Sequence, residues 1–321
     1  MSTMMPGAPL APATNEADEG RYWLDREGIL GPLLLLPTIV YIFALVGVPL
    51  VLAVLFSLSD ATVGDPGIDL VGFRNFVDVA RDGTFQQALR NTLVFTFVSQ
   101  AVVLVLANIL ALTLAADFKG KRLVRFLVLL PWTTPIALGA LGWFWMLDSV
   151  YSPIDFVLRE VGLLGPGTPW GPRRNMYWLG KDDLARLAVL FVHIWRTLPF
   201  ATVILLAGLT SLPGDVREAA MVDGAGFWRQ LFYIRLPLLM PIMAVAVLFG
   251  MVFTFTDMTV VHILTRGGPV DATQVLASWA FYRGVEGGNL GQGAAIALFL
   301  FPALVGVAVL MLRIARRTET S

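Results

Sequence analysis

Residues whose types and spacing could do chemistry are scarce in this chain of 321 residues. No G-x-x-x-x-G-K-[ST] phosphate loop is present, and the nearest string, at 117–122, lacks both the spacing and the following Ser or Thr. The chain holds no cysteine, and its two histidines, His193 and His262, stand among apolar residues, where we interpret them as packing residues. We therefore predict a chain that binds no nucleotide, metal or cofactor and catalyses no reaction.

The helices that position any functional residue are expected to lie within a membrane. Of the residues, 57% are hydrophobic and only 14% charged, whereas soluble domains carry roughly a quarter charged residues. A net charge of zero gives no reason to expect a nucleic-acid partner. Six intervals without Asp, Glu, Lys or Arg are each about long enough to span a bilayer, and the fourth extends back to 187 if Arg196 is allowed within it. They run 28–59, 91–116, 126–147, 197–214, 236–256 and 287–312. The sequence thus predicts an all-α membrane protein with six transmembrane helices.

The chain ends and the basic residues set the expected organisation. The first 20 residues are small, polar and acidic, a composition that cannot bury enough apolar surface to fold alone. We expect a flexible tail at 1–28, a membrane domain at 29–317 and a short tail at 318–321. The short segment 117–125 concentrates four basic residues, and because Lys and Arg favour the cytoplasmic side, both chain ends are expected to be cytoplasmic.

The segment 211–241, between the fourth and fifth intervals, predicts a short helix outside the membrane. Pro213 suits a first helical turn, Asp215 and Glu218 suit the positive N-terminal end, and Gly224 suits the residue that ends the helix. These signals predict a helix over about 213–223. One face would then carry Val216, Ala219, Ala220 and Asp223. The alanines would leave a shallow surface that another protein could approach, although a simple structured loop fits the spacing equally well.

The same segment resembles the EAA loop of the permease subunits of ABC importers. The resemblance is carried by Glu218-Ala219-Ala220, Gly224 and Ile234-Arg235-Leu236-Pro237. It implies a type I importer permease in which the loop, here 211–237, inserts a coupling helix into a cleft of an ATPase subunit. The residues that it assigns to this contact are Glu218, Ala219, Ala220, Asp223 and Gly224.

Further stretches are similar to the carbohydrate-importing branch, which includes permeases for maltose and glycerol phosphate. They are Leu264-Thr265-Arg266-Gly267-Gly268-Pro269, which is similar to a T-x-G-G-P turn, and Gly72-Phe73-Arg74-Asn75-Phe76 followed by Asn91-Thr92-Leu93. The resemblance covers roughly 29–317. It implies a prokaryotic cell-membrane subunit that pairs with a second homologous permease, two ATPase subunits that hydrolyse ATP, and an extracytoplasmic sugar-binding protein.

If the cargo is a sugar, its path should offer aromatic faces and hydrogen-bonding groups. Pro131 and Pro135 bracket a stretch where an opened helix would expose polar groups. The candidate path residues are Trp132, Thr133, Thr134, Arg196, Thr254 and Asp257. For the tryptophan, anchoring at the membrane interface is an alternative. For Arg196, a structural pair with a carboxylate of the partner permease is an alternative to sugar contact.

Two other classes of membrane protein are alternatives. A self-contained, ion-coupled secondary transporter would need an ionisable relay within the membrane. Only Arg196 lies well inside a predicted span, with Asp148 and Asp257 at outer edges. A membrane-embedded enzyme would need a catalytic cluster, which the sequence does not show. The sequence therefore favours a translocation subunit and does not specify which sugar it carries.

Overall fold

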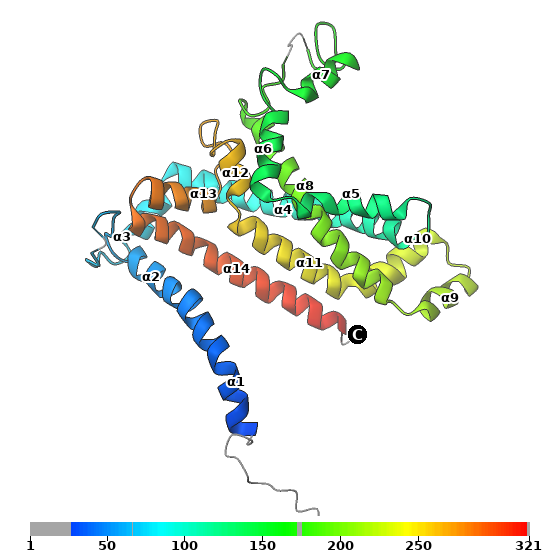
Figure 1. Cartoon of the computed structure of the whole chain (residues 1–321), viewed down its shortest axis with the longest axis horizontal. Helices are drawn as coiled ribbons and strands as arrows, with labels where there is room; N and C mark the ends of the chain where they lie inside the picture. Colours follow the sequence, from blue (N-terminus) through cyan, green and yellow to red (C-terminus); the bar gives the residue numbers. More distant parts are fainter. Residues whose placement is uncertain (1–26, 66, 172–174, 320–321) are drawn as a thin grey trace, which may run out of the picture. The chain divides into compact units, whose positions relative to one another are not determined.

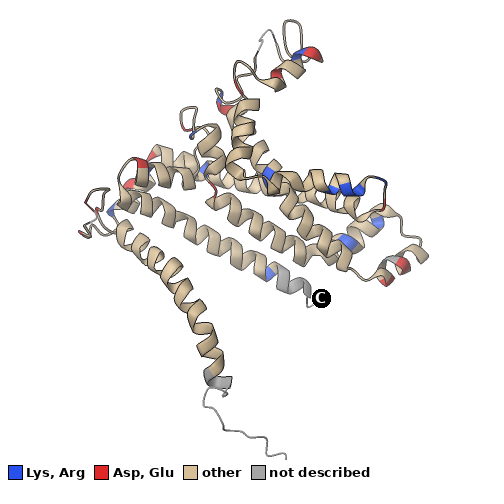
Figure 2. Ribbon diagram, viewed as in Figure 1, with Lys and Arg blue, Asp and Glu red and all other residues tan. Residues whose placement is uncertain are grey.

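The computed structural model describes residues 27–65, 67–171 and 175–319, so most of the predicted tail at 1–28 lies outside the described residues. All named elements in these ranges are helical. The all-α membrane architecture predicted from the sequence is confirmed. Figure 2 shows that charged residues gather at helix ends and in loops, with long uncharged helical stretches between them.

The chain divides into two compact units, residues 1–52 and 53–321. The first unit holds α1 (Glu27–Ile42), the π-helical segment η2 (Phe43–Gly47) and the start of α2 (Val48–Ser57). Together these form a continuous apolar helix from Leu30 to Ser57, which is long enough to cross a membrane. Its large apolar side chains are exposed from Leu30 to Val54, as expected for a helix whose surroundings are lipid or another protein.

The second unit is built on four further long apolar helices (Figure 1). They are α4 (Gly83–Ala115), α8 (Asp182–Ser211), the run of α10 (Phe227–Gln230), η3 (Leu231–Arg235) and α11 (Leu236–Thr256), and α14 (Leu290–Glu319). α4 packs along α8, and α11 packs against α4, α8 and α14. α14 continues to Glu319, so Thr318 and Glu319 of the predicted tail at 318–321 are helical, and 320–321 lie outside the described residues.

Three of these helical runs start well before the charge-free intervals that predicted them, and one is the run of α10, η3 and α11, which begins at Phe227 rather than near 236. α4 begins at Gly83 rather than near 91, and α8 begins at Asp182 rather than near 187 or 197. Arg90 and Arg186 therefore lie within the first turns, where a long charged side chain can reach out of the apolar zone. The side chain of Asp82 fixes the start of α4 by accepting hydrogen bonds from the backbone N–H groups of Thr84 and Phe85.

The third predicted span is broken. α5 (Lys121–Thr133) and α6 (Ile136–Met146) are apolar enough to span only as a pair, and they meet at an angle of 98°. The break lies at Thr134, which adopts an extended conformation with ψ 131°. Pro135 causes this, because a proline disfavours the helical conformation of the preceding residue and has no N–H to continue the helix. The described residues thus contain five spanning helices, or six with the bent pair as one span.

Shorter helices lie at the two ends of the bundle in the second unit (Figure 1). α9 (Gly214–Val222) follows α8 and adjoins the C-terminal end of α4; this is called the α9 end. The α13 end carries the other short elements, which are α3 (Arg74–Arg81), α12 (Thr259–Leu264), α13 (Leu276–Phe281) and η4 (Tyr282–Glu286). α7 (Pro153–Glu160) follows α6.

Small side chains let the long helices approach closely. Ala107 and Ala111 of α4 and Ala201 of α8 are buried in one cluster with Leu205. Between membrane helices, such small residues permit close backbone packing, which provides dispersion contacts in place of a hydrophobic driving force. Backbones also approach closely near the α13 end, where Gly293 of α14 lies against Gly284 of η4.

Replacement of Gly293 by alanine should destabilise the bundle. The added Cβ would lie 2.4 Å from Cα of Gly284 and 3.0 Å from the backbone oxygen of Ala280, so the backbone itself must move. We expect a cost on the order of 1–3 kcal/mol, measured as a lower thermal unfolding midpoint of the purified chain in detergent. Gly306→Ala in the same helix is the control, because nothing lies within 4 Å of its added Cβ. Equal midpoints for the two variants would contradict this packing.

Candidate functional site

α9 has the position and bounds that the sequence predicted, within one residue at each end. It follows Pro213, and the chain turns at Gly224, whose φ of +69° lies in the left-handed region that favours glycine. The N–H of Ala225 donates to the carbonyl of Ala220 at 2.9 Å, which closes the turn. The helix is therefore held at a defined angle between α8 and α10.

The faces of α9 differ from the expectation of one shared surface. Ala220 is buried, with 6% exposure, whereas Glu218, Ala219 and Asp223 are exposed. Adjacent helical residues point about 100° apart, and α9 is oriented so that Ala220 faces inward and Ala219 outward. Ala220 packs towards the bundle, and the surface open to another molecule is the acidic one around Glu218 and Ala219.

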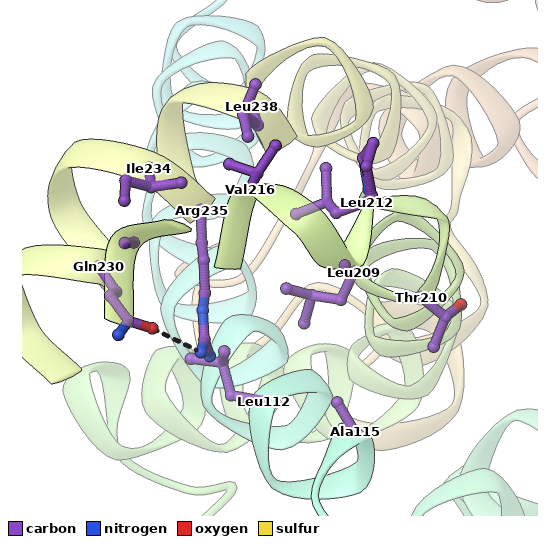
Figure 3. Close-up of a pocket in the computed structure, with 13 residues that line it drawn as sticks. Leu112, Ala115, Leu209, Thr210, Leu212, Val216, Gln230, Ile234, Arg235 and Leu238 are labelled. Atoms are coloured by element: carbon purple, nitrogen blue, oxygen red, sulfur yellow. Dashed lines mark hydrogen bonds between the residues drawn. The ribbon is translucent and has the colours of Figure 1, made fainter. Parts of the chain in front are cut away.

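A pocket of about 310 Å³ separates α9 from the bundle (Figure 3). Its lining comes from the ends of α4 and α8, from α9, and from the segment that leads into α11. The side chain of Arg235 extends into it, and the guanidinium donates to Oε1 of Gln230 at 3.3 Å. Sequence reasoning did not detect this pocket, because its walls come from four separate parts of the chain.

A second group of residues forms a polar cluster inside the bundle. This polar cluster is Gln100 of α4, His193 and Arg196 of α8, Thr254 of α11 and Asp257 just after it. Nη1 of Arg196 donates to Oδ2 of Asp257 at 2.5 Å. The structure pairs Arg196 with a carboxylate of the same chain, a partner that neither sequence-based alternative for this residue had included.

The other members of the polar cluster converge on Thr254. Its hydroxyl donates to the carbonyl of Gly250 at 2.8 Å, and it accepts from Nε2 of Gln100 at 3.2 Å. Nε2 of His193 lies 2.9 Å from the same oxygen, and since the single hydroxyl proton is used, we assign His193 as the donor. The bonding capacity of Thr254 is thus occupied within the chain, which the sequence-based expectation of a free substrate contact did not foresee.

The three predicted residues at the helix break have separate surroundings. The hydroxyls of Thr133 and Thr134 both donate back to the carbonyl of Leu130, at 3.1 and 2.8 Å. Thr134 also lines a recess together with Arg196, so the structure brings these two candidates together. Trp132, with 39% exposure, lies on another surface.

Trp132 belongs to an aromatic face formed with Phe200 of α8 and with Phe249 and Phe253 of α11. It stacks on Phe200 at a centroid distance of 4.8 Å, and Phe200 makes edge contacts with both other rings. Trp132 and Phe249 are exposed, so part of this face is open. The spacing of Phe249 and Phe253, four residues apart on one helix, could have identified a shared face, but their proximity to Trp132 could not be deduced from the sequence.

The Asn91-Thr92-Leu93 motif contacts the segment that follows the T-x-G-G-P turn, at the α13 end. Nδ2 of Asn91 donates to the carbonyls of Ala272 and Gln274, both at 2.9 Å, and the hydroxyl of Thr92 accepts from the N–H of Leu276 at 2.9 Å. The start of α4 therefore holds the turn that follows α12.

Nδ1 of His262, in α12, lies 2.8 Å from the hydroxyl of Tyr282. Among the described residues, no group of three or more His, Cys, Asp or Glu could hold a metal ion.

Substitution Arg196→Gln should lower the stability of the fold. It would leave Asp257, with 12% exposure, without its charged partner. We expect the free energy of unfolding to fall by about 2–3 kcal/mol. This is the lower part of the range for truncating one partner of a buried charge pair, because Arg196 is partly exposed. The measurement is thermal unfolding of the purified chain.

The double variant Arg196→Gln, Asp257→Asn should recover more than half of this loss, because no unpaired charge remains. Arg74→Gln is the control, because its pair with Asp78 is exposed and should contribute little. If the single and double variants lose equal stability, the charge pair does not hold α8 to the end of α11.

Comparison with known proteins gives the family. The family model described as "Binding-protein-dependent transport system inner membrane component" matches residues 104–320. The trehalose/maltose transport system permease protein MalF of Thermococcus litoralis is 31% identical over 292 residues, covering 91% of this chain and 95% of the relative. The sulfoquinovosyl glycerol transport system permease protein SmoG of Agrobacterium fabrum is 31% identical over 301 residues, covering 92% and 94%.

A solved structure agrees in fold. The crystal structure of a bacterial alginate ABC transporter in complex with an alginate pentasaccharide-bound periplasmic protein contains a chain that matches with a TM-score of 0.77. The match has 21% sequence identity and covers 92% of this chain and 96% of that one. The family model covers more than half of this chain, including α9 and most of the bundle. This chain therefore belongs to the family of binding-protein-dependent transport system inner membrane components.

Proposed function

We propose that this chain forms one half of the membrane pore of an ATP-driven sugar importer and that α9 couples the pore to an ATPase subunit. The observation that carries the proposal is α9 itself, a short helix fixed between two spans with an exposed acidic surface at Glu218 and Asp223. The relatives named for trehalose/maltose, sulfoquinovosyl glycerol and sn-glycerol-3-phosphate support a carbohydrate or a related polyol as cargo.

The proposed assembly follows from what this chain lacks. Its sequence has no phosphate loop, so ATP must be hydrolysed elsewhere, and we assign this to two ATPase subunits. A second homologous permease would complete the pore, and an extracytoplasmic sugar-binding protein would deliver the cargo. The family description and the solved complex with a periplasmic protein support the last of these partners.

The proposed topology places the α9 end in the cytoplasm. An ATPase subunit is soluble, so the helix that meets it must lie on that side. The start of α5 lies at the same end and carries Lys121, Arg122 and Arg125 (Figure 2), in agreement with the preference of basic residues for the cytoplasmic side. Both chain ends would then be cytoplasmic, with 29–317 as the membrane domain and 211–237 as its coupling loop.

The proposed sugar path uses the two surfaces near the broken span. The aromatic face around Trp132 offers rings on which a sugar can stack, Thr133 is exposed next to it in the sequence, and Thr134 lines a recess with Arg196. The Arg196 side chain is 26% exposed and has five N–H donors, of which the pair with Asp257 uses one, so it remains a candidate contact. Thr254 and Asp257 would act differently, by fixing α8 against the end of α11, since their bonds are made within the chain. No specific observation favours a secondary transporter.

The turn at Gly224 provides the test of coupling. A valine at φ +69° is strained, so Gly224→Val should tilt α9 at a local cost on the order of 1–3 kcal/mol. In the transporter reconstituted with its ATPase subunits, we expect sugar uptake to collapse while the chain still inserts into the membrane. The purified chain alone should hydrolyse no ATP.

Gly226→Val is the matched control. Neither glycine has an atom within 4 Å of its added Cβ, but Gly226 has φ −65° and ψ 170°, which valine adopts readily. Uptake should therefore remain near the wild-type rate in this variant. Normal uptake by Gly224→Val, or ATP hydrolysis by the chain free of partners, would contradict the proposed function.

Trp132→Ala tests the sugar path. Loss of one stacking ring should raise the KM for sugar uptake about threefold to tenfold, with subunit assembly and basal ATP hydrolysis unchanged. Trp145→Ala, an exposed tryptophan of α6 outside the aromatic face, should leave the KM unchanged. An unchanged KM in Trp132→Ala would remove the aromatic face from the proposed path.

A further inference from the structure

The pocket beneath α9 has the lining of a binding site for an amphiphile. Its volume of about 310 Å³ lies at the lower end of the usual range for small-molecule sites. Aliphatic side chains from four helical segments form most of the wall: Leu112, Leu209, Leu212, Val216, Ile234 and Leu238 (Figure 3). A large apolar recess that stays open in a packed bundle lacks the dispersion contacts that an occupant would supply.

One charged side chain enters this apolar pocket. Arg235 is half-buried, and the only hydrogen bond found for it in the described part of the chain goes to the neutral oxygen of Gln230. Asp215, Glu218 and Asp223 of α9 are exposed, and none lies within ion-pairing distance of Arg235. A partly buried charge without a counter-ion is costly, so the site is complementary to an anionic group.

The pocket lies at the ends of the spanning helices, which is the level at which lipid headgroups lie in a membrane. It lies where α4 and α8 end and where the run into α11 begins. That run exposes Trp228, Phe232 and Tyr233, and aromatic residues of this kind gather at the boundary between membrane and water. Basic pockets between helices at this level suit the phosphates of anionic lipids.

We propose that the pocket binds one anionic phospholipid, with the phosphate on the guanidinium of Arg235 and an acyl chain against Leu209, Leu212 and Leu238. This binding requires only that the chain lies in a membrane, which its family membership gives. Val216 and Ala220 of α9 line the same pocket, so the lipid fills the space between α9 and the ends of α4 and α8. It would thereby transmit force between the coupling helix and the spans.

Retention of lipid by the purified full chain tests this proposal. Native mass spectrometry would compare phosphatidylglycerol with phosphatidylcholine of the same acyl chains. We expect the wild-type chain to retain one phosphatidylglycerol more tightly, and Arg235→Gln to weaken its retention about fivefold or more. Arg235→Lys should keep part of the affinity because it keeps the charge.

Two further variants separate a specific site from general attraction. Arg229→Gln removes an exposed charge from α10 outside the pocket, so this variant should retain phosphatidylglycerol as tightly as the wild type does. Val216→Phe enlarges a partly exposed wall residue and should displace the lipid while the charge remains. The proposal is overturned if both lipids are retained equally, if Arg229→Gln loses as much as Arg235→Gln, or if millimolar inorganic phosphate displaces the phosphatidylglycerol.

Discussion

The charge pair between Arg196 and Asp257 is the interaction on which the arrangement of the second unit depends. A charge within a membrane span is tolerated only where it faces a partner or a cavity, and here both partners come from one chain, 61 residues apart. Asp257 also accepts from the N–H of Thr259 at 2.8 Å, so the pair fixes the point where α11 ends and α12 begins. Through Thr254 and Gln100 the same polar cluster extends to α4, which joins three helices at one level.

From this level, two rigid elements lead to the α9 end. α8 continues without interruption from Arg196 to Ser211, about 22 Å at the rise of an α-helix. α11 returns from the other side of α9 to the polar cluster. These helices would, in the proposed importer, carry a displacement of α9 to the residues beside the broken span, where the aromatic face and Thr134 lie. In the proposed importer, this connection relates the state of the ATPase subunit to the shape of the sugar path.

Features set by local signals could be predicted from the sequence, and features set by long-range contacts could not. The spans and α9 were predicted because apolar stretches, Pro213 and Gly224 act within a few residues, and Pro135 likewise marked the break at Thr134. The partner of Arg196 was missed because the pairing depends on how α8 packs against α11. The same reason applies to the aromatic face, to the pocket at Arg235, and to the contact between Asn91 and the turn at Ala272. The unequal burial of Ala219 and Ala220 also depends on how α9 is oriented against the bundle.

The absence of native cysteine makes a direct test of the central claim possible, because any introduced thiol is unique in this chain. Glu218→Cys, on the exposed surface of α9, would be paired with single cysteines placed in the cleft of the ATPase subunit. We expect disulfide cross-links in the assembled transporter whose yield changes with ATP, since the two partners move together. Tyr151→Cys, an exposed residue between α6 and α7, should form none. No cross-link from Glu218→Cys, or an equal yield from Tyr151→Cys, would contradict the proposal that α9 couples this chain to an ATPase.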